Sequence, residues 1–117
     1  MPLYTADASI DHLSLQTVPE KFIVFYSSVV DGQLWCPDCR DVDPLIKEVF
    51  EPEDGPSALI VYVGNRQQWK TPDNIWRQEP WKITGVPSVV RLEDGKPGER
   101  LVEDDIATQL KEFVKKQ

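Results

Sequence analysis

The sequence predicts an α/β domain in which helices flank a central mixed β-sheet. Strand-length apolar runs alternate with segments of helical periodicity over the first two thirds of the chain. A hairpin signal and a final amphipathic segment follow, which would add antiparallel strands to a parallel pair. With 117 residues, 40% of them hydrophobic, the chain is long enough for one core, so we expect a single domain over residues 1–117.

The first half of the chain predicts a buried strand followed by a long helix. Residues 9–16 have the spacing of a short helix, which Pro19 would end. Residues 22–26 are continuously apolar, as inner strands are. Residues 37–50 read as a helix, and Pro44 is expected to kink it and to separate its first turn. The apolar residues at helical spacing are Val42, Leu45, Ile46, Val49 and Phe50.

The middle of the chain predicts a second buried strand and a loop. Residues 58–63 form another continuously apolar run. Residues 64–72 read as loop, and Asp73 or Asn74 would cap a short helix over residues 75–77.

The last third predicts a β-hairpin and a helix. Residues 87–92 and 99–102 read as strands, joined by a hairpin loop over residues 93–98. Asp104 or Asp105 would cap the final helix. Its inner face would contain Ile106, Leu110, Phe113 and Val114.

Composition restricts the class of function. A net charge of −7 argues against a nucleic-acid partner, because phosphates would be repelled. No run reaches the ~18 apolar residues of a membrane span, so no membrane association is expected. The first residues lack the pattern of a secretory signal, which predicts a cytoplasmic protein. We also expect it to be a monomer. In the reducing cytosol, two cysteines indicate redox or metal chemistry rather than structural disulfides.

The most informative stretch is Trp35-Cys36-Pro37-Asp38-Cys39. Pro37 favours a helix start, where free N–H groups stabilise negative charge, so Cys36 is the predicted nucleophile. Cys39, one helical turn on, is the predicted resolving thiol of a thiol–disulfide exchange. The Asp38 carboxylate would oppose a nearby thiolate and select partners, or it would only serve the first turn of the helix.

Two tryptophans are candidates for substrate contact. Trp35 is expected to flank Cys36 and offer a contact face, with a core position as the alternative. Trp69 lies in the predicted loop, where it would either line a substrate groove or pack beneath the loop. A zinc site is a further interpretation of the cysteines, but the chain offers only His12 as an imidazole ligand, so no metal is expected.

These residues give the chain a resemblance to a known family. Together with the pentapeptide motif, the segments that carry it are Val63-Gly64-Asn65-Arg66, Trp69-Lys70, Pro72-Asp73-Asn74, Thr84-Gly85-Val86-Pro87-Ser88 and Arg100-Leu101-Val102-Glu103. The chain resembles the thioredoxin domain-containing protein 17 (thioredoxin-related protein 14) family of the thioredoxin superfamily. The resemblance implies a thioredoxin fold, with the CxxC motif at the N-terminus of a kinked helix.

The resemblance also implies further site residues. Pro87 would follow a cis peptide bond and pack against the CxxC turn, leaving the Val86 backbone free to bind an extended substrate. Tyr26 and Ser27 would support the site from the end of their strand. Ordinary thioredoxins carry a buried acid in this strand, and the matching position here is Val24, so no base for Cys39 is evident.

The implied activity is reduction of protein or small-molecule disulfides. Electrons would come from NADPH through thioredoxin reductase, with no bound cofactor. Two alternatives stay open. One is a glutaredoxin-like, glutathione-dependent reductase, against which Glu93 and Asp94 would repel the carboxylates of glutathione. The other is a redox-silent binding module, against which both cysteines are intact.

Overall fold

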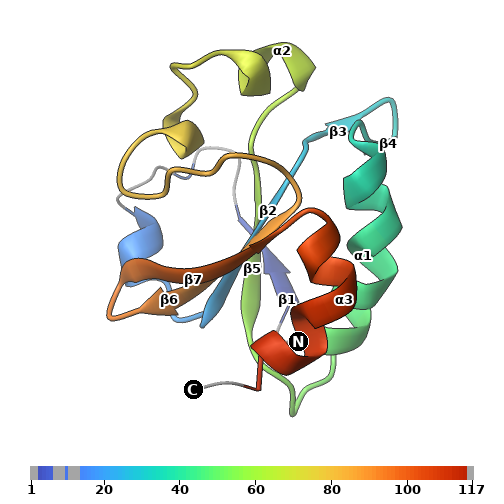
Figure 1. The fold of residues 1–117 in the computed structure, drawn as a ribbon, viewed down its shortest axis with the longest axis vertical. Helices are drawn as coiled ribbons and strands as arrows, with labels where there is room; N and C mark the ends of the chain where they lie inside the picture. The colour runs from blue at the N-terminus through green and yellow to red at the C-terminus, as the bar shows by residue number, and fades with distance from the viewer. Residues whose placement is uncertain (1–2, 7–9, 11–13, 116–117) are drawn as a thin grey trace.

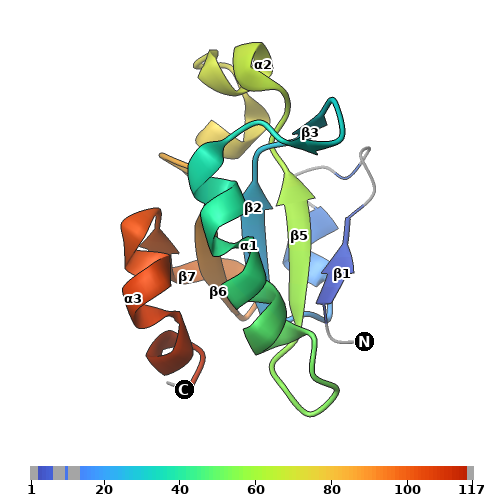
Figure 2. The same cartoon turned by 90° about the vertical axis from the view of Figure 1, so that its right-hand side faces the viewer.

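The computed structural model describes residues 3–6, 10 and 14–115, and it contains a five-stranded sheet in the order β1-β5-β2-β6-β7. Two helices, α1 (Pro37–Phe50) and α3 (Asp104–Phe113), cover one face of this sheet (Figures 1 and 2). The strands are β1 (Leu3–Thr5), β2 (Phe22–Tyr26), β5 (Ala58–Tyr62), β6 (Ser88–Glu93) and β7 (Lys96–Val102).

The sheet is mixed, as predicted. Strand β5 pairs in parallel with β1 and β2, whereas β6 pairs antiparallel with β2 and β7. Strand β1 was not predicted, because its three residues contain no apolar run and pair only at the sheet edge. Half of the predicted helix over residues 9–16 lies outside the described residues, and Ser14–Thr17 is a 3₁₀ turn.

The core lies on both faces of the central strand β2, whose five residues are all buried. On the helical face, the ring of Phe22 lies 5.6 Å from that of Phe50 and 5.8 Å from that of Phe113. On the opposite face, the ring of Phe25 lies 5.6 Å from Trp76 and 6.1 Å from Trp81. Burial on both faces explains why this strand is continuously apolar rather than alternating.

Helix α1 is a single helix from Pro37 to Phe50, so the prediction that Pro44 separates its first turn is wrong. Val42, Ile46 and Phe50 are buried against the sheet. Proline removes one backbone hydrogen bond within a helix. The packing of this apolar face keeps the helix continuous where Pro44 lacks that hydrogen bond.

Two short elements lie in segments for which neither a strand nor a helix was predicted. Strands β3 (Val29–Val30) and β4 (Gln33–Leu34) form a small hairpin before α1. Helix α2 (Arg66–Lys70) follows β5, within residues that predicted a loop. Both elements lie at the same end of the sheet as the start of α1 (Figures 1 and 2).

The β6–β7 hairpin is tighter than predicted. Its turn is Asp94-Gly95, with φ of 55° and 77°, so residues 96–98 belong to β7 rather than to the loop. Both turn residues have the positive φ typical of two-residue hairpin turns. Pro97 is tolerated because β7 is an edge strand.

Helix α3 begins differently from the prediction. Its N-cap is Glu103, without a side-chain cap hydrogen bond, and Asp104 and Asp105 lie in the first turn. Ile106, Leu110 and Phe113 are buried on the predicted face. Among the described residues, no helix is long and apolar enough to cross a membrane.

Candidate redox site

Both cysteines lie at the N-terminus of α1 as free thiols. Cys36 is the N-cap residue and is 8% exposed, whereas Cys39 is fully buried. Pro37 occupies the start of the helix, and no side chain caps the first turn. The first turn therefore keeps N–H groups available beside the more exposed thiol, the arrangement that favours a sulfur anion.

Ser27, directly after β2, forms hydrogen bonds with both cysteines. Its hydroxyl accepts a hydrogen bond from the Cys36 N–H at 3.1 Å, and its own N–H donates to Cys39 Sγ at 3.5 Å. Ser27 is fully buried. The end of the central strand therefore fixes the redox turn, which confirms the supporting position predicted for Ser27.

Burial raises the pKa of the Cys39 thiol to about 12. The Ser27 N–H opposes this effect, because it stabilises the thiolate. The neighbouring Cys36 raises the pKa again through its charge and a side-chain hydrogen bond. Cys39 is consequently a neutral thiol at neutral pH, held close to the sulfur of Cys36.

The peptide bond between Val86 and Pro87 is cis, which confirms the prediction for Pro87. The Cys36 thiol donates to the Val86 carbonyl, with 3.7 Å between Sγ and the oxygen. The Val86 N–H has no hydrogen-bond partner within the described part of the chain. A backbone N–H beside a reactive sulfur can pair with an extended peptide.

Trp35 is half-buried beside Cys36 and is held from two sides. Its indole N–H donates to the Gly64 carbonyl at 2.8 Å. The guanidinium of Arg66 lies over the ring, 5.0 Å from its centroid. Trp35 therefore combines the two predicted positions, since it packs against the core and also borders the site.

Trp69 is only 6% exposed, and its contact with substrate stays a prediction. The guanidinium of Arg77 lies 3.9 Å from the Trp69 ring centroid, and its Nε donates to the Trp69 carbonyl at 2.6 Å. Trp69 thus packs beneath the segment around α2, which was the alternative. Trp76 and Trp81 are also buried.

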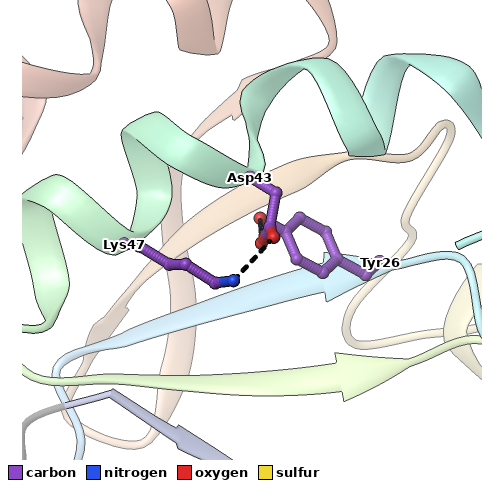
Figure 3. A network of polar contacts seen from close by, with 3 residues as sticks. All are labelled: Tyr26, Asp43 and Lys47. Atoms are coloured by element: carbon purple, nitrogen blue, oxygen red, sulfur yellow. Dashed lines mark hydrogen bonds and ion pairs between the residues drawn. The ribbon is translucent and has the colours of Figure 1, made fainter. Parts of the chain in front are cut away.

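Asp43 is part of a polar network rather than of a solvated helix face. The Tyr26 hydroxyl donates to Asp43 Oδ1 at 3.0 Å, and Lys47 Nζ lies 3.2 Å from Oδ2 (Figure 3). Burial, followed by the Asp43 charge, raises the pKa of Tyr26, which therefore stays a neutral donor. Asp43 lies four residues after Cys39, a spacing that places both side chains on one face of the helix.

The central strand β2 contributes no acid to the dithiol. Val24 is fully buried, so the central strand supplies no acid at that position. Asp38 is exposed between the two cysteines. Among the described residues, no three histidine, cysteine or acidic side chains are grouped to hold a metal ion, and His12 lies outside them.

Sequence reasoning missed three residues that shape this site. Gly64 and Arg66 hold Trp35, and Glu103 lies beside the Val86 segment, as described below. Gly64 and Arg66 belong to the segments that carry the family resemblance, and this was their only signal. Their contacts join residues about 30 positions apart, which local patterns do not indicate.

Comparison with known proteins decides the family. Residues 6–116 match the family described as thioredoxin domain-containing protein 17-like, thioredoxin domain. The chain belongs to this family. The match covers nearly the whole sequence, including both cysteines and the Val86–Pro87 segment.

Relatives from plants and animals are 35–37% identical to this chain over the aligned residues. The thioredoxin-like protein Clot of Arabidopsis thaliana is 35% identical over 107 residues, which is 86% of this chain and 79% of that protein. Clot of Oryza sativa is 37% identical over 80 residues, 63% of this chain. That match spans only 58% of the rice protein. Mouse thioredoxin domain-containing protein 17 is 37% identical over 83 residues, 68% of this chain and 62% of that protein.

Solved thioredoxins share the fold. Malassezia sympodialis thioredoxin superposes with a TM-score of 0.64 at 18% identity, covering 97% of this chain and 91% of that one. The reduced thioredoxin pre-protein of Schistosoma mansoni gives a TM-score of 0.62 at 18% identity, covering 98% and 97%. The predicted thioredoxin fold is therefore confirmed.

Proposed function

We propose that this protein is a disulfide reductase in which Cys36 attacks the substrate and Cys39 resolves the intermediate. The observation that carries the proposal is the pair of free thiols at an uncapped helix start, the first facing the Val86 carbonyl. Trp35 and the Val86-Pro87 segment border Cys36 and would receive the substrate.

The reaction consists of two exchanges. The Cys36 thiolate attacks one sulfur of the substrate disulfide, and the other sulfur leaves as a thiolate that takes up a proton. Cys39 then loses its proton and attacks Cys36 Sγ, which forms the Cys36–Cys39 disulfide and releases the second substrate thiol. The protein loses two electrons, and the substrate gains them.

The raised pKa of Cys39 suits this order of events. A neutral, buried Cys39 does not compete with Cys36 for the first attack. Its proton must leave before the second exchange, and the departing substrate thiolate can accept it. The Ser27 N–H then stabilises the Cys39 anion at the moment of attack.

The resulting disulfide needs an external reductant. We propose thioredoxin reductase, with electrons from NADPH, as the source in the cytoplasm, and no bound cofactor. Support comes from family membership and from the dithiol itself, which requires no prosthetic group for exchange. Protein or small-molecule disulfides are the proposed substrates of a monomeric enzyme.

The electron source is tested by coupled turnover. Purified protein is given a disulfide peptide together with either NADPH and thioredoxin reductase or NADPH, glutathione and glutathione reductase. We expect NADPH consumption to depend on this protein only in the first mixture. Turnover only in the second mixture would instead identify a glutathione-dependent enzyme. No turnover in either mixture would indicate a redox-silent binding module.

The order of attack is tested with Cys39→Ser. Without the resolving thiol, a mixed disulfide between Cys36 and the substrate should accumulate and be visible by intact mass spectrometry. Cys36→Ser is the matched control and should trap nothing. Trapping through Cys39 in that control would reverse the assigned roles.

A further inference from the structure

Glu103 has an unusual backbone beside the proposed site. As the N-cap of α3 it has φ of 53° and ψ of −117°, a region that residues with a Cβ rarely adopt. Its N–H donates to the Pro87 carbonyl at 2.8 Å, which ties the start of α3 to the segment facing Cys36. A strained, exposed residue at this place suggests a function for its side chain.

The side chain of Glu103 covers the backbone of Gly85. Gly85 is buried, and a methyl group built on it would collide with Glu103 Oε1. Only a glycine therefore lets the carboxylate lie this close to the chain. The carboxylate lies against the residue that directly precedes Val86.

This position places a charge along the proposed substrate path. The Val86 carbonyl contacts Cys36 Sγ at 3.7 Å, and the Val86 N–H is unpaired among the residues described. An extended substrate that pairs with Val86 must run beside Gly85, because strand pairing aligns neighbouring residues. Its side chain next to the reactive cysteine would then approach the Glu103 carboxylate.

The charge of Glu103 is not neutralised within the described structure. The ion pairs found there join other residues, and none includes Glu103. Asp38, exposed between the cysteines, adds a second carboxylate to the surroundings of Cys36. The cation Arg66 lies over the Trp35 ring.

We infer that Glu103 is a specificity-determining residue, which favours disulfides whose reactive cysteine is flanked by a lysine or arginine and disfavours those flanked by an acid. The inference rests on the proposed reductase function and names the substrate class of that site. One carboxylate about 7 Å from a substrate charge changes the rate by roughly threefold in either direction. Lysine-flanked and glutamate-flanked substrates should therefore differ by roughly three- to tenfold.

The test uses three synthetic disulfide peptides that differ only in one residue beside the attacked cysteine: lysine, glutamine or glutamate. Pre-reduced protein is mixed with each peptide, and second-order rate constants are measured by quenched flow. The variants are Glu103→Gln, which removes the charge, and Glu103→Ala, which also uncovers Gly85. Glu112→Gln removes the same charge from the far end of α3 and is the control.

Wild type and Glu112→Gln should prefer the lysine peptide to the glutamate peptide, and Glu103→Gln should reduce that ratio at least threefold. Raising salt from about 20 to about 300 mM should have the same effect on wild type. An unchanged ratio in Glu103→Gln overturns the inference, as does a gain for all peptides in Glu103→Ala alone, which would indicate a steric role. The glutamine peptide tests the proposed function separately, since failure to reduce it would refute the reductase and not only the role of Glu103.

Discussion

The starts of α1 and α2 lie at the same end of the sheet (Figure 1). They differ in capping, because side chains cap the first turn of α2 and none caps the first turn of α1. Helix α2 has a complete capping box, in which Asn65 Oδ1 accepts from the Gln68 N–H and Gln68 Oε1 accepts from the Asn65 N–H, both at 2.8 Å. Helix α1 begins at Cys36 with no side-chain cap.

Helix length explains this difference. A helix of five residues cannot persist without caps, because nucleation is unfavourable and few internal bonds follow. The 14 residues of α1 are held by their buried face, so the helix can leave its first N–H groups open to a sulfur anion. The capped helix supports the site through Gly64 and Trp35, while the uncapped helix carries the reactive thiols.

Giving α1 a cap should produce the largest effect. Cys36→Ser replaces the thiol by a capping hydroxyl, so reductase activity should fall at least about a thousandfold with the loss of the nucleophile. The free energy of unfolding should rise by about 0.5–1 kcal/mol. Coupled NADPH turnover and urea unfolding measure the two effects. A lower free energy of unfolding in Cys36→Ser would show that the missing side-chain cap does not destabilise α1.

The state of the buried thiol at this helix start should make stability depend on pH. The folded pKa of Cys39 is raised from 9.0 to about 12, so its stabilising contribution is complete below pH 9 and is lost as the pH rises towards 12. The loss can reach at most about 1.4 kcal/mol per pH unit. Urea unfolding of reduced protein at rising pH measures it. The Cys36–Cys39 disulfide form is the control, and equal losses in both forms would contradict the assignment to Cys39.

Ser27→Ala tests whether the strand end replaces the missing cap of α1. The substitution leaves the buried Cys36 N–H without its acceptor, which should cost about 1–3 kcal/mol of unfolding free energy. Ser57→Ala is the control, because that hydroxyl accepts the Lys21 N–H at an exposed position. Similar small losses in the two variants would show that Ser27 does not hold the redox turn.

Asn65→Ala tests the capped helix in the same way. It removes the Oδ1 acceptor of the capping box and leaves the bond from the backbone N–H of residue 65 to Gln68 Oε1, and the expected cost is about 1 kcal/mol. Asn65→Asp keeps the acceptor oxygen and should retain most of the stability. Chemical unfolding followed by tryptophan fluorescence compares the variants. Equal losses in the alanine and aspartate variants would contradict the role of the cap.

The smallest expected effect concerns α3, which also begins without a side-chain cap. Glu103→Gly allows the positive φ at this N-cap, so the free energy of unfolding should rise by about 0.5–1 kcal/mol. Glu103→Ala keeps the strain and should bring no such gain. A glycine variant less stable than the alanine variant would show that the side chain stabilises this turn.

Local patterns predicted the elements that local physics determines. The apolar run of β2 and the helical spacing of Val42, Ile46 and Phe50 identified a central strand and the long helix. The same patterns missed β1 and α2. Each is too short to show a periodicity, and β1 exists because β5 offers a free edge.

The sequence by itself determined the α/β class, the dithiol and its place at a helix start, because the Cys36–Cys39 spacing and the helical face are properties of neighbouring residues. The thioredoxin fold was implied by the family resemblance. Only the tertiary structure decided what surrounds the sulfurs. Ser27, Gly64 and Val86 reach the site from separate elements, and Glu103 covers Gly85 through a turn that no local preference favours. Burial and hydrogen bonding of a thiol depend on groups distant in the chain, so the pKa of Cys39 follows from packing rather than from its neighbours in sequence.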